Sequence, residues 1–385
     1  MEVVILAGGL GTRLRGVLSS IPKCMAPVSG RPFLGWMLDW IMQYPVDHVV
    51  FSVGYLKEQI IDFVKAGSWP FRYDFAMEET PLGTGGGIAL ALGLCEGNEV
   101  VVVNGDTFFP ADLSALTFDA PVTLALKRLR HFDRYGAVEC SGGRIAAFHE
   151  KAPCEDGLIN GGVYAIDRSR LDLSSLRAPF SFEREVLEPG VTAGMIAGRE
   201  CGAYFIDIGI PEDLVRAQWE IPAWFAVRRA SEAVLASDAR TLFLDRDGVL
   251  NRLRPGDYVK NWAEWEWMPG VLDEMPRWAR KFAHIVLVSN QRCVGKGLMS
   301  DADLSRIHAR MMTEILDAGG RLDLVLTCTA TDDGDPRRKP NPGMFREACS
   351  LIPAIEGGKS IMIGDTPSDA AFAKNCGMQF VLLAS

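Results

Sequence analysis

Short apolar runs alternate with amphipathic stretches over the first half of the chain. The apolar runs are predicted strands, at 3–7, 49–53, 100–103 and 122–126. The stretches 33–44 and 56–64 between them have helical spacing. Strands that alternate with helices predict a mostly parallel sheet covered on both faces. After Gly136 the pattern loosens into short strands and turns.

The same alternation begins again near residue 241. Residues 221–238 are helical in character and carry no strand signal. Further strands are then predicted at 241–244, 284–289, 322–327, 360–363 and 380–383. A chain of 385 residues is long enough for two cores. We therefore predict an α/β protein with a first domain over 1–222, a helical connector over 223–240 and a second domain over 241–385.

Composition and charge narrow the classes of function. Apolar residues make up 48% of the chain and charged residues 23%, which is typical of a globular protein. A net charge of −9 disfavours nucleic acid as a partner, and no apolar run is long enough to span a bilayer. The nine scattered cysteines include no CxxC pair and fit a reducing compartment. We expect a cytoplasmic protein without nucleic-acid or membrane partners, and leave a homo-oligomer open.

A glycine-rich turn follows the first predicted strand, in the stretch LAGGLGTRLR. Glycines let backbone N–H groups approach phosphate oxygens closely. Arg13 and Lys23 add two cations that suit a triphosphate, and Asp106 and Asp207 lie at strand ends where carboxylates can hold Mg²⁺. Each feature alone has an ordinary structural explanation, such as a turn glycine or a capping aspartate. Together they predict a site for a nucleotide.

These motifs, with Glu150–Lys151 and Asn160–Gly162, resemble the sugar-1-phosphate nucleotidylyltransferase family over nearly all of residues 1–220. The resemblance implies a Rossmann-like (GT-A-like) fold. It also implies in-line attack of a sugar 1-phosphate on the α-phosphorus of a nucleoside triphosphate, with loss of pyrophosphate. On this resemblance Arg13 and Lys23 neutralise the triphosphate, and Asp106 and Asp207 hold Mg²⁺.

The same resemblance implies further binding residues. Lys151 would meet the sugar phosphate, and Glu150 and Asn160 would meet sugar hydroxyls. The other implied nucleotide- or substrate-binding residues are Leu6, Ala7, Gly8, Gly9, Gly11, Thr12, Gly83, Thr84, Asn104 and Gly136.

Finer motifs, PLGTGGGIAL, NGDTFF, HFDRYGAV and YFIDIGIPEDL, are similar to the D-glycero-α-D-manno-heptose 1-phosphate guanylyltransferase subgroup. Glu78 lies where this family often reads the base. A carboxylate can accept hydrogen bonds from guanine N1–H and N2–H together, whereas the carbonyls of uracil would repel it. We therefore expect GTP as the nucleotide, with a plain surface glutamate as the alternative.

A second set of polar residues follows the later predicted strands. A lone DxD is explained by a chance acidic turn, but groups at the carboxyl ends of parallel strands converge. The ordered set, placed at four strand ends, therefore predicts phosphate chemistry. In chain order it comprises Asp245, Asp247, Ser289, Lys339, Asp365 and Asp369.

This set resembles the haloacid dehalogenase-type (HAD) phosphatase superfamily over residues 241–385. The resemblance implies a HAD-like Rossmannoid fold, and the intervals between the motifs are too short for more than a minimal cap. Asp245 would attack phosphorus and form an aspartyl-phosphate, and Asp247 would protonate the leaving group and later activate water. Asp245, Asp365 and the backbone carbonyl of Asp247 would hold Mg²⁺, with Asp369 nearby in support.

The resemblance also implies the groups that hold the phosphate. Ser289 and Lys339 would bind phosphoryl oxygens, with Asn290, Gln291 and Arg338 beside them.

Within that superfamily, the motifs DRDGVLN, SNQ, RKPNPGM and GDTPSDA are similar to the heptose bisphosphate and histidinol-phosphate phosphatase branch. That branch usually carries a Cys/His zinc loop before the RKP segment. Here Cys328 is the only candidate ligand, so we expect no structural zinc. Cys293 stands where the branch tends to have glycine, which bears on substrate choice.

The two resemblances describe consecutive reactions. A phosphatase that removes the 7-phosphate of a heptose 1,7-bisphosphate leaves the heptose 1-phosphate that a guanylyltransferase converts to GDP-heptose. One alternative is a nucleotidylyltransferase for another sugar, such as mannose 1-phosphate, beside a phosphatase of unrelated role. Another is that one half is only a regulatory binding module. Trp262, Trp265 and Trp267 are expected to pack in a core or interface rather than to rim the phosphatase site.

Overall fold

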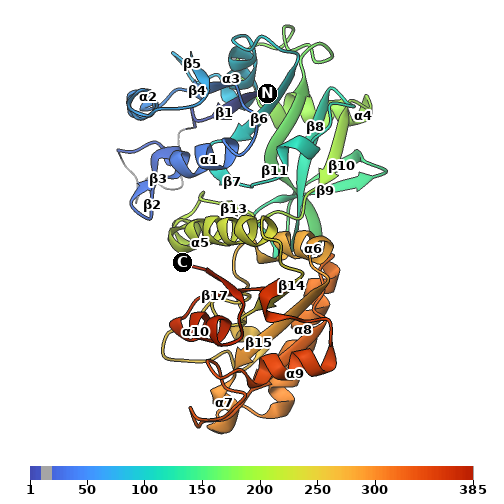
Figure 1. Cartoon of the computed structure of the whole chain (residues 1–385). Coiled ribbons are helices and arrows are strands. Elements are labelled where there is room, and N and C mark those ends of the chain that lie inside the picture. Colours follow the sequence, from blue (N-terminus) through green and yellow to red (C-terminus); the bar gives the residue numbers. More distant parts are fainter. Residues whose placement is uncertain (10–19, 385) are drawn as a thin grey trace. The chain divides into compact units, whose positions relative to one another are not determined.

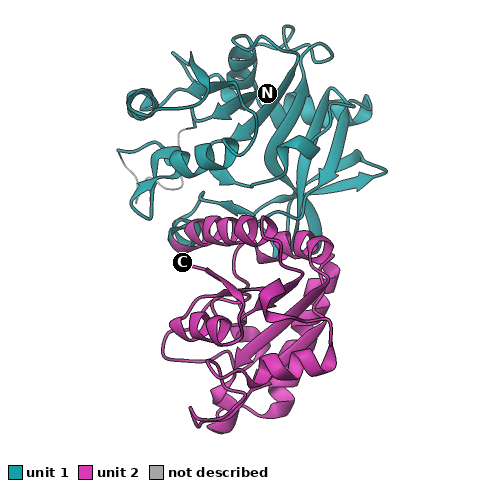
Figure 2. Cartoon of the chain, viewed as in Figure 1, with its two compact units in different colours: residues 1–218 teal, residues 219–385 magenta. Residues whose placement is uncertain are grey.

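The computed structural model describes residues 1–9 and 20–384 (Figure 1). The chain forms two compact units, Met1–Gln218 and Trp219–Ser385 (Figure 2). In the described part of the chain, no helix has the length and apolar character that crossing a membrane requires.

A nine-stranded sheet forms the centre of unit 1. Its first four strands are mutually parallel, and the fifth runs antiparallel to them. Val3, Val4 and Ile5 are all fully buried, as expected for a strand that is covered on both faces. In spatial order the strands are β5 (Arg72–Met77), β4 (His48–Val53), β1 (Glu2–Leu6), β6 (Glu99–Asn104), β11 (Cys154–Asp167), β8 (Val122–Phe132), β12 (Ile196–Glu200), β10 (Arg144–Lys151) and β9 (Gly136–Ser141).

The strand β8 is much longer than the predicted 122–126. Its residues up to Leu126 are buried, but from Lys127 on buried and exposed positions mix, and the charged side chains there hid the strand signal.

The order β5-β4-β1-β6 makes the connections reverse direction between β1 and β6. Ligand sites in open α/β sheets lie at such a switch point, beyond the carboxyl ends of the strands. A small antiparallel pairing sets Asp207 opposite Thr107 and so brings Asp106 and Asp207 to one place. The remaining elements of the unit are α1 (Phe33–Ile41), α2 (Lys57–Ala66), α3 (Gly83–Leu92), α4 (Glu188–Thr192), η2 (Lys23–Met25), η3 (Leu113–Ala115), η4 (Glu183–Leu187), β2 (Pro27–Val28), β3 (Arg31–Pro32), β7 (Thr107–Phe108) and β13 (Ile206–Asp207).

Unit 2 has a five-stranded parallel sheet with a second switch point between β14 and β17. Because side chains alternate along a strand, Leu242 and Leu244 belong to the core cluster on one face, and Phe243 belongs to the other. The strands in spatial order are β16 (Leu324–Cys328), β15 (His284–Asn290), β14 (Thr241–Leu244), β17 (Ser360–Gly364) and β18 (Gln379–Leu382). The other elements are α6 (Val271–Lys281), α7 (Arg292–Gly295), α8 (Asp301–Asp317), α9 (Gly343–Leu351), α10 (Pro367–Asn375), η5 (Trp262–Glu264) and η6 (Gly357–Lys359).

The long helix α5 (Pro211–Leu235) passes the division between the units. Its residues 223–235, the helical part of the predicted connector, contribute to the core of unit 2. Arg228 and Ser231 both contact the buried carboxylate of Glu274 on α6, at 2.6 and 2.5 Å. The last turns of α5 are therefore tied into unit 2, while the limits 222 and 240 stay predictions.

Two candidate active sites

A cavity of about 590 Å³ lies at the switch point of unit 1. It is formed by the turn after β1, by η2, by the residues after β5 and β6, and by the start of α3. Its lining comprises Leu6, Ala7, Gly8, Gly9, Lys23, Cys24, Ser52, Glu78, Pro81, Gly83, Thr84, Gly87, Asn104, Gly105, Asp106 and Gly209.

Most of the predicted nucleotide-binding residues meet in this cavity. The sequence analysis missed its lining residues Cys24, Ser52, Pro81, Gly87, Gly105 and Gly209. Three of these are glycines beside or within motifs already singled out, which is the signal that was available. A Cβ on Gly87 would lie 3.0 Å from Glu78 Oε1, and one on Gly8 only 2.9 Å from it. The glycines thus make room for the glutamate.

Glu78 is fixed at one end of its carboxylate. Its Oε2 accepts a hydrogen bond from the backbone N–H of Leu82 at 2.9 Å, directly before α3. Its Oε1 lies 3.5 Å from Ser52 Oγ. The side chain is half-buried in the wall of the cavity, so a carboxylate of set orientation faces any ligand there.

Two carboxylates and one ammonium group meet at the edge of this cavity. Lys23 Nζ lies 2.5 Å from Asp106 Oδ2 and 3.3 Å from Asp207 Oδ1. Burial and the neighbouring Asp106 charge raise the pKa of Asp207 despite the lysine. Since one ammonium group does not offset two close carboxylates, the pair fits an additional cation.

Arg134 and Tyr135 lie close to this charge cluster, although the sequence analysis assigned neither of them. Arg134 donates to Asp213 Oδ2 at 2.6 Å and to the Tyr135 hydroxyl at 3.1 Å. Burial and the charge of Asp207 raise the pKa of Tyr135 to about 12, so the hydroxyl stays protonated. Arg134, which lies in the motif HFDRYGAV, is thus a further cation near Asp207. The sequence analysis had used this motif only for its resemblance.

Four residues predicted to bind nucleotide or sugar, Gly136, Glu150, Lys151 and Asn160, lie outside the cavity lining. Glu150 and Lys151 are exposed on β10, and Gly136 pairs with Lys151 across the hairpin. Asn160 uses its side chain within β11, where it accepts from Gly162 N–H and donates to Tyr164 Oη. Their roles remain predictions. Gly11, Thr12 and Arg13 lie outside the described residues.

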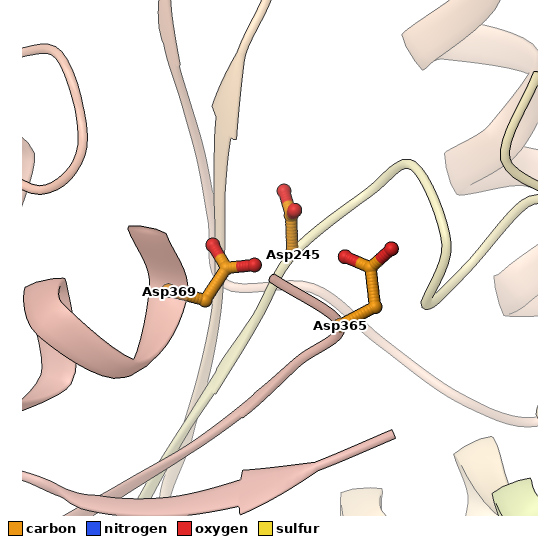
Figure 3. Close-up of side chains that lie close together, drawn as sticks. All are labelled: Asp245, Asp365 and Asp369. Carbon is orange, nitrogen blue, oxygen red and sulfur yellow. The ribbon is translucent and has the colours of Figure 1, made fainter. Parts of the chain in front are cut away.

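The second site lies at the switch point of unit 2. Asp245 directly follows β14, Asp365 follows β17, and Asp369 lies in the first turn of α10 (Figure 3). One oxygen from each of the three carboxylates lies within 4.8 Å of the other two. Lys339 Nζ, itself buried, lies 2.8 Å from Asp245 Oδ1 and 2.6 Å from Asp369 Oδ1. Lys339 was placed at a strand end, which is wrong: it lies in the loop between β16 and α9.

The charge balance of this cluster favours a bound cation. Burial raises the pKa of Asp245 to about 7, and burial with the charge of Asp369 raises that of Asp365 to about 6. Burial opposes the charge of Lys339, but the two carboxylates outweigh it and raise the lysine pKa. Among the described residues, the buried Asp365 Oδ1 has no hydrogen-bond partner. An orphaned carboxylate oxygen beside a second acid suits a divalent metal.

Asp369 has a different use from the other two acids. Its Oδ1 accepts a hydrogen bond from Lys339 Nζ. Its Oδ2 accepts hydrogen bonds from the backbone N–H and the hydroxyl of Thr366, at 3.1 and 2.6 Å, and these bonds are part of a capping box at the start of α10. Asp245 and Asp365 are therefore the residues best placed to hold a metal. Gly248, at φ +85°, leaves no space for a side chain, since a Cβ there would lie 2.0 Å from Asp365 Oδ2.

Asp247 is held by three side-chain donors. Its Oδ1 accepts from Arg246 at 2.9 Å and from Asn251 at 3.0 Å, and its Oδ2 accepts from Gln291 at 2.7 Å. Burial alone would raise the pKa of Asp247, but the charge of Arg246 and these hydrogen bonds lower it. Gln291 also donates to Ser289 Oγ at 2.8 Å, which joins the second aspartate to the predicted phosphate-binding hydroxyl.

Two other predicted neighbours of the phosphate have defined contacts. Asn290 exchanges two hydrogen bonds with the backbone of Lys339, both at 3.0 Å, and so fixes the loop that carries the lysine. Arg338 pairs with Asp333, at 2.9 Å from Nε to Oδ1. Cys328 Sγ lies 3.7 Å from Asp335 Oδ1.

Comparisons with known proteins relate the two halves of the chain to different families. The family profile described as "Nucleotidyl transferase" matches residues 2–223, and a HAD-hydrolase-like profile matches residues 336–385. The D-glycero-alpha-D-manno-heptose 1-phosphate guanylyltransferase of Aneurinibacillus thermoaerophilus is 41% identical over 226 residues, which is 57% of this chain and 98% of that relative.

Two further comparisons concern each half separately. The crystal structure of HddC from Yersinia pseudotuberculosis complexed with GMP-PN is 35% identical, with a TM-score of 0.52, and the match covers 56% of this chain and 97% of that one. The D-glycero-alpha-D-manno-heptose-1,7-bisphosphate 7-phosphatase of Mycobacterium tuberculosis is 40% identical over 138 residues, 35% of this chain and 71% of that relative. The chain thus belongs to the nucleotidyl transferase family over residues 2–223 and to the HAD-like phosphatases in its second half.

Proposed function

We propose that the chain is a bifunctional enzyme of nucleotide-activated heptose synthesis. Unit 2 hydrolyses the 7-phosphate of D-glycero-D-manno-heptose 1,7-bisphosphate. Unit 1 then transfers GMP from GTP to the resulting heptose 1-phosphate, which gives GDP-heptose and pyrophosphate. One observation carries the proposal: the relatives of the two halves are named for consecutive reactions, and the product of the phosphatase is the substrate of the guanylyltransferase.

In unit 2, the reaction uses the aspartates on the turn after β14. Asp245 attacks phosphorus while the bond from phosphorus to the sugar oxygen breaks, and that oxygen takes a proton from Asp247. Asp247 is ionised in the free protein, and the incoming phosphate charge favours its protonation. In the second step Asp247 accepts a proton from water, whose oxygen attacks phosphorus and releases phosphate from Asp245. Lys339 and Ser289 hold the phosphoryl oxygens.

In unit 1, catalysis consists of positioning and charge neutralisation. The sugar-phosphate oxygen attacks the α-phosphorus, and pyrophosphate leaves. Lys23 already lies between Asp106 and Asp207 at the cavity edge, where it can reach a triphosphate. The glycines after β1 allow the backbone to approach the phosphates, and Glu78 accepts from the guanine edge. Arg13 is proposed for the triphosphate on the resemblance.

Both sites have donor sets that fit Mg²⁺. In unit 2 these are Asp245 and Asp365, with the orphaned oxygen of Asp365, and in unit 1 Asp106 and Asp207. Carboxylate oxygens are the ligands that Mg²⁺ prefers, and the ion would offset the charge of the reacting phosphates. We expect both activities to disappear in a chelator and to return with added Mg²⁺.

A panel of substrates tests the assignment of unit 1. Pyrophosphate release is measured with GTP, ATP, CTP or UTP, each with D-glycero-α-D-manno-heptose 1-phosphate or mannose 1-phosphate. The proposal predicts the largest kcat/KM for GTP with the heptose. A Glu78→Gln variant should lose most of the preference for GTP, since an amide cannot accept from both guanine donors at once. A higher kcat/KM with mannose 1-phosphate, or an unchanged GTP preference in Glu78→Gln, would contradict it.

A further inference from the structure

Arg246 is a buried arginine that lies in the sequence between Asp245 and Asp247, the two reactive aspartates of unit 2. Its side chain is 1% exposed, and its NH2 group donates to Asp247 Oδ1 at 2.9 Å. A buried guanidinium is costly unless a carboxylate pairs with it and other groups satisfy its hydrogens. Arg246 is only partly satisfied, because its buried Nε has no hydrogen-bond partner in the part of the chain that the structure describes. Such a cost is typical of a residue kept for function.

Several groups fix the guanidinium in one place. Its NH1 lies 3.5 Å from Nε2 of His308 on α8, and its Cζ lies 5.8 Å from the ring centroid of Trp265. Trp265 in turn stacks on Trp262 at 5.1 Å and meets Trp267 edge-on at 5.0 Å. The tryptophans singled out in the sequence therefore form the packed wall behind Arg246. Trp265 belongs to the core cluster of unit 2, and the other two pack against it.

The Asp247 carboxylate is held at both oxygens yet remains accessible. Arg246 and Asn251 donate to Oδ1, and Gln291 donates to Oδ2. The Asp247 side chain is nevertheless 27% exposed, so a substrate can reach it. Of the three donors, only Arg246 is charged and backed by an aromatic wall. Removing it leaves two neutral amides, which hold a carboxylate less strongly.

We infer that Arg246 is a positioning residue. It packs against His308 and Trp265, and it holds Asp247 where that side chain passes its proton to the leaving oxygen. The inference rests on the phosphatase function proposed for unit 2. In the step concerned, the bond from Asp245 to phosphorus forms, the bond from phosphorus to the leaving oxygen breaks, and the proton moves from Asp247 to that oxygen. Misplacing Asp247 should therefore lower kcat/KM most for substrates whose leaving group needs this proton.

A comparison of leaving groups tests the inference. Because kcat/KM covers the steps up to departure of the leaving group, it is measured for a primary alkyl phosphate, which needs a proton, and for p-nitrophenyl phosphate, which does not. For Arg246→Met we expect kcat/KM to fall about 10²-fold with the alkyl phosphate and less than about threefold with the aryl phosphate, on the scale of lost general-acid catalysis. The control is Arg310→Met, whose exposed guanidinium lies over Trp262 at 4.9 Å. It should leave both values unchanged.

Two results would overturn the inference. One is an equal fall with both phosphates, which would indicate general damage to the site. The other is a gain with the alkyl phosphate, which would mean that Arg246 mainly opposes protonation of Asp247. A crystal structure of Arg246→Met gives an independent check. The Asp247 carboxylate should leave its position beside Asn251 and Gln291, and an unmoved carboxylate would overturn the inference even if the proposed phosphatase function failed.

Discussion

The buried ammonium group of Lys339 offers a quantitative test of the second site. Lys339→Met removes the positive charge and keeps much of the apolar stem. The side chain of Lys339 is 2% exposed, and those of its partners Asp245 and Asp369 are 11% and 1% exposed. The substitution therefore leaves two carboxylates close together in a region that water hardly reaches.

The expected loss follows from the cost of an unpaired buried charge. Breaking a buried ion pair by removing one partner costs about 3–5 kcal/mol. Asp245 already has its pKa raised to about 7 and can take up a proton once the lysine is gone, which limits the cost. We therefore expect unit 2 to lose about 3 kcal/mol of unfolding free energy in metal-free buffer at neutral pH.

The assay is unfolding in urea, monitored by hydrogen exchange in peptides from β14 and β17. These peptides report on unit 2 alone. The matched control is Lys359→Met, since Lys359 makes an exposed ion pair with Glu356 at 3.0 Å. An exposed pair of this kind contributes less than about 0.5 kcal/mol. If Lys339→Met cost no more than the control, the desolvated charge cluster would be the wrong description of the site.

Three further predictions separate the two sites and their charges. Asp245→Asn should abolish phosphate release and leave pyrophosphate release from GTP and heptose 1-phosphate within about twofold, since the first site keeps all its residues; a matched loss of both would refute independent sites. Lys23→Met should lower nucleotidyl transfer by about 10²–10³, the scale of one lost preorganised charge, with phosphatase activity unchanged; a smaller loss than tenfold would remove Lys23 from the mechanism. The third concerns pH. Asp365 has a pKa of about 6 in the folded protein, which is above its pKa in the unfolded chain. The unfolding free energy of the metal-free protein therefore falls as the pH rises from the unfolded pKa to the folded pKa, and the full loss is present at higher pH. Asp365→Asn should thus stabilise metal-free unit 2 at pH 8 by about 1 kcal/mol after allowance for solvent screening, with little effect at pH 4; equal effects at the two pH values would count against the raised pKa.

The sequence predicted the fold best where strands are buried on both faces. Near-continuous apolar runs such as β1, β4 and β14 are typical of buried parallel strands. The glycines and acidic residues at the ends of such strands indicated both switch points. It failed in the second half of β8, because a strand that leaves the core loses its apolar signature.

Contacts between distant side chains were beyond the reach of the sequence. Nothing in the motif FLDRDGVLN shows that the Arg246 guanidinium reaches Asp247 while a tryptophan from another segment and His308 of α8 pack around it. The different uses of Asp365 and Asp369 also depended on geometry. Only the hydrogen bonds from Lys339 and Thr366 show that both carboxylate oxygens of Asp369 already accept hydrogen bonds.

The most direct test of the central claim is a time course with one protein and one starting sugar. The enzyme is mixed with Mg²⁺, GTP and D-glycero-α-D-manno-heptose 1,7-bisphosphate, and phosphate, pyrophosphate and GDP-heptose are measured together. Two sites acting in sequence predict that phosphate appears first, after which pyrophosphate and GDP-heptose rise in equal amounts following a lag. Pyrophosphate release without prior loss of phosphate, or phosphate release that never leads to GDP-heptose, would contradict the claim.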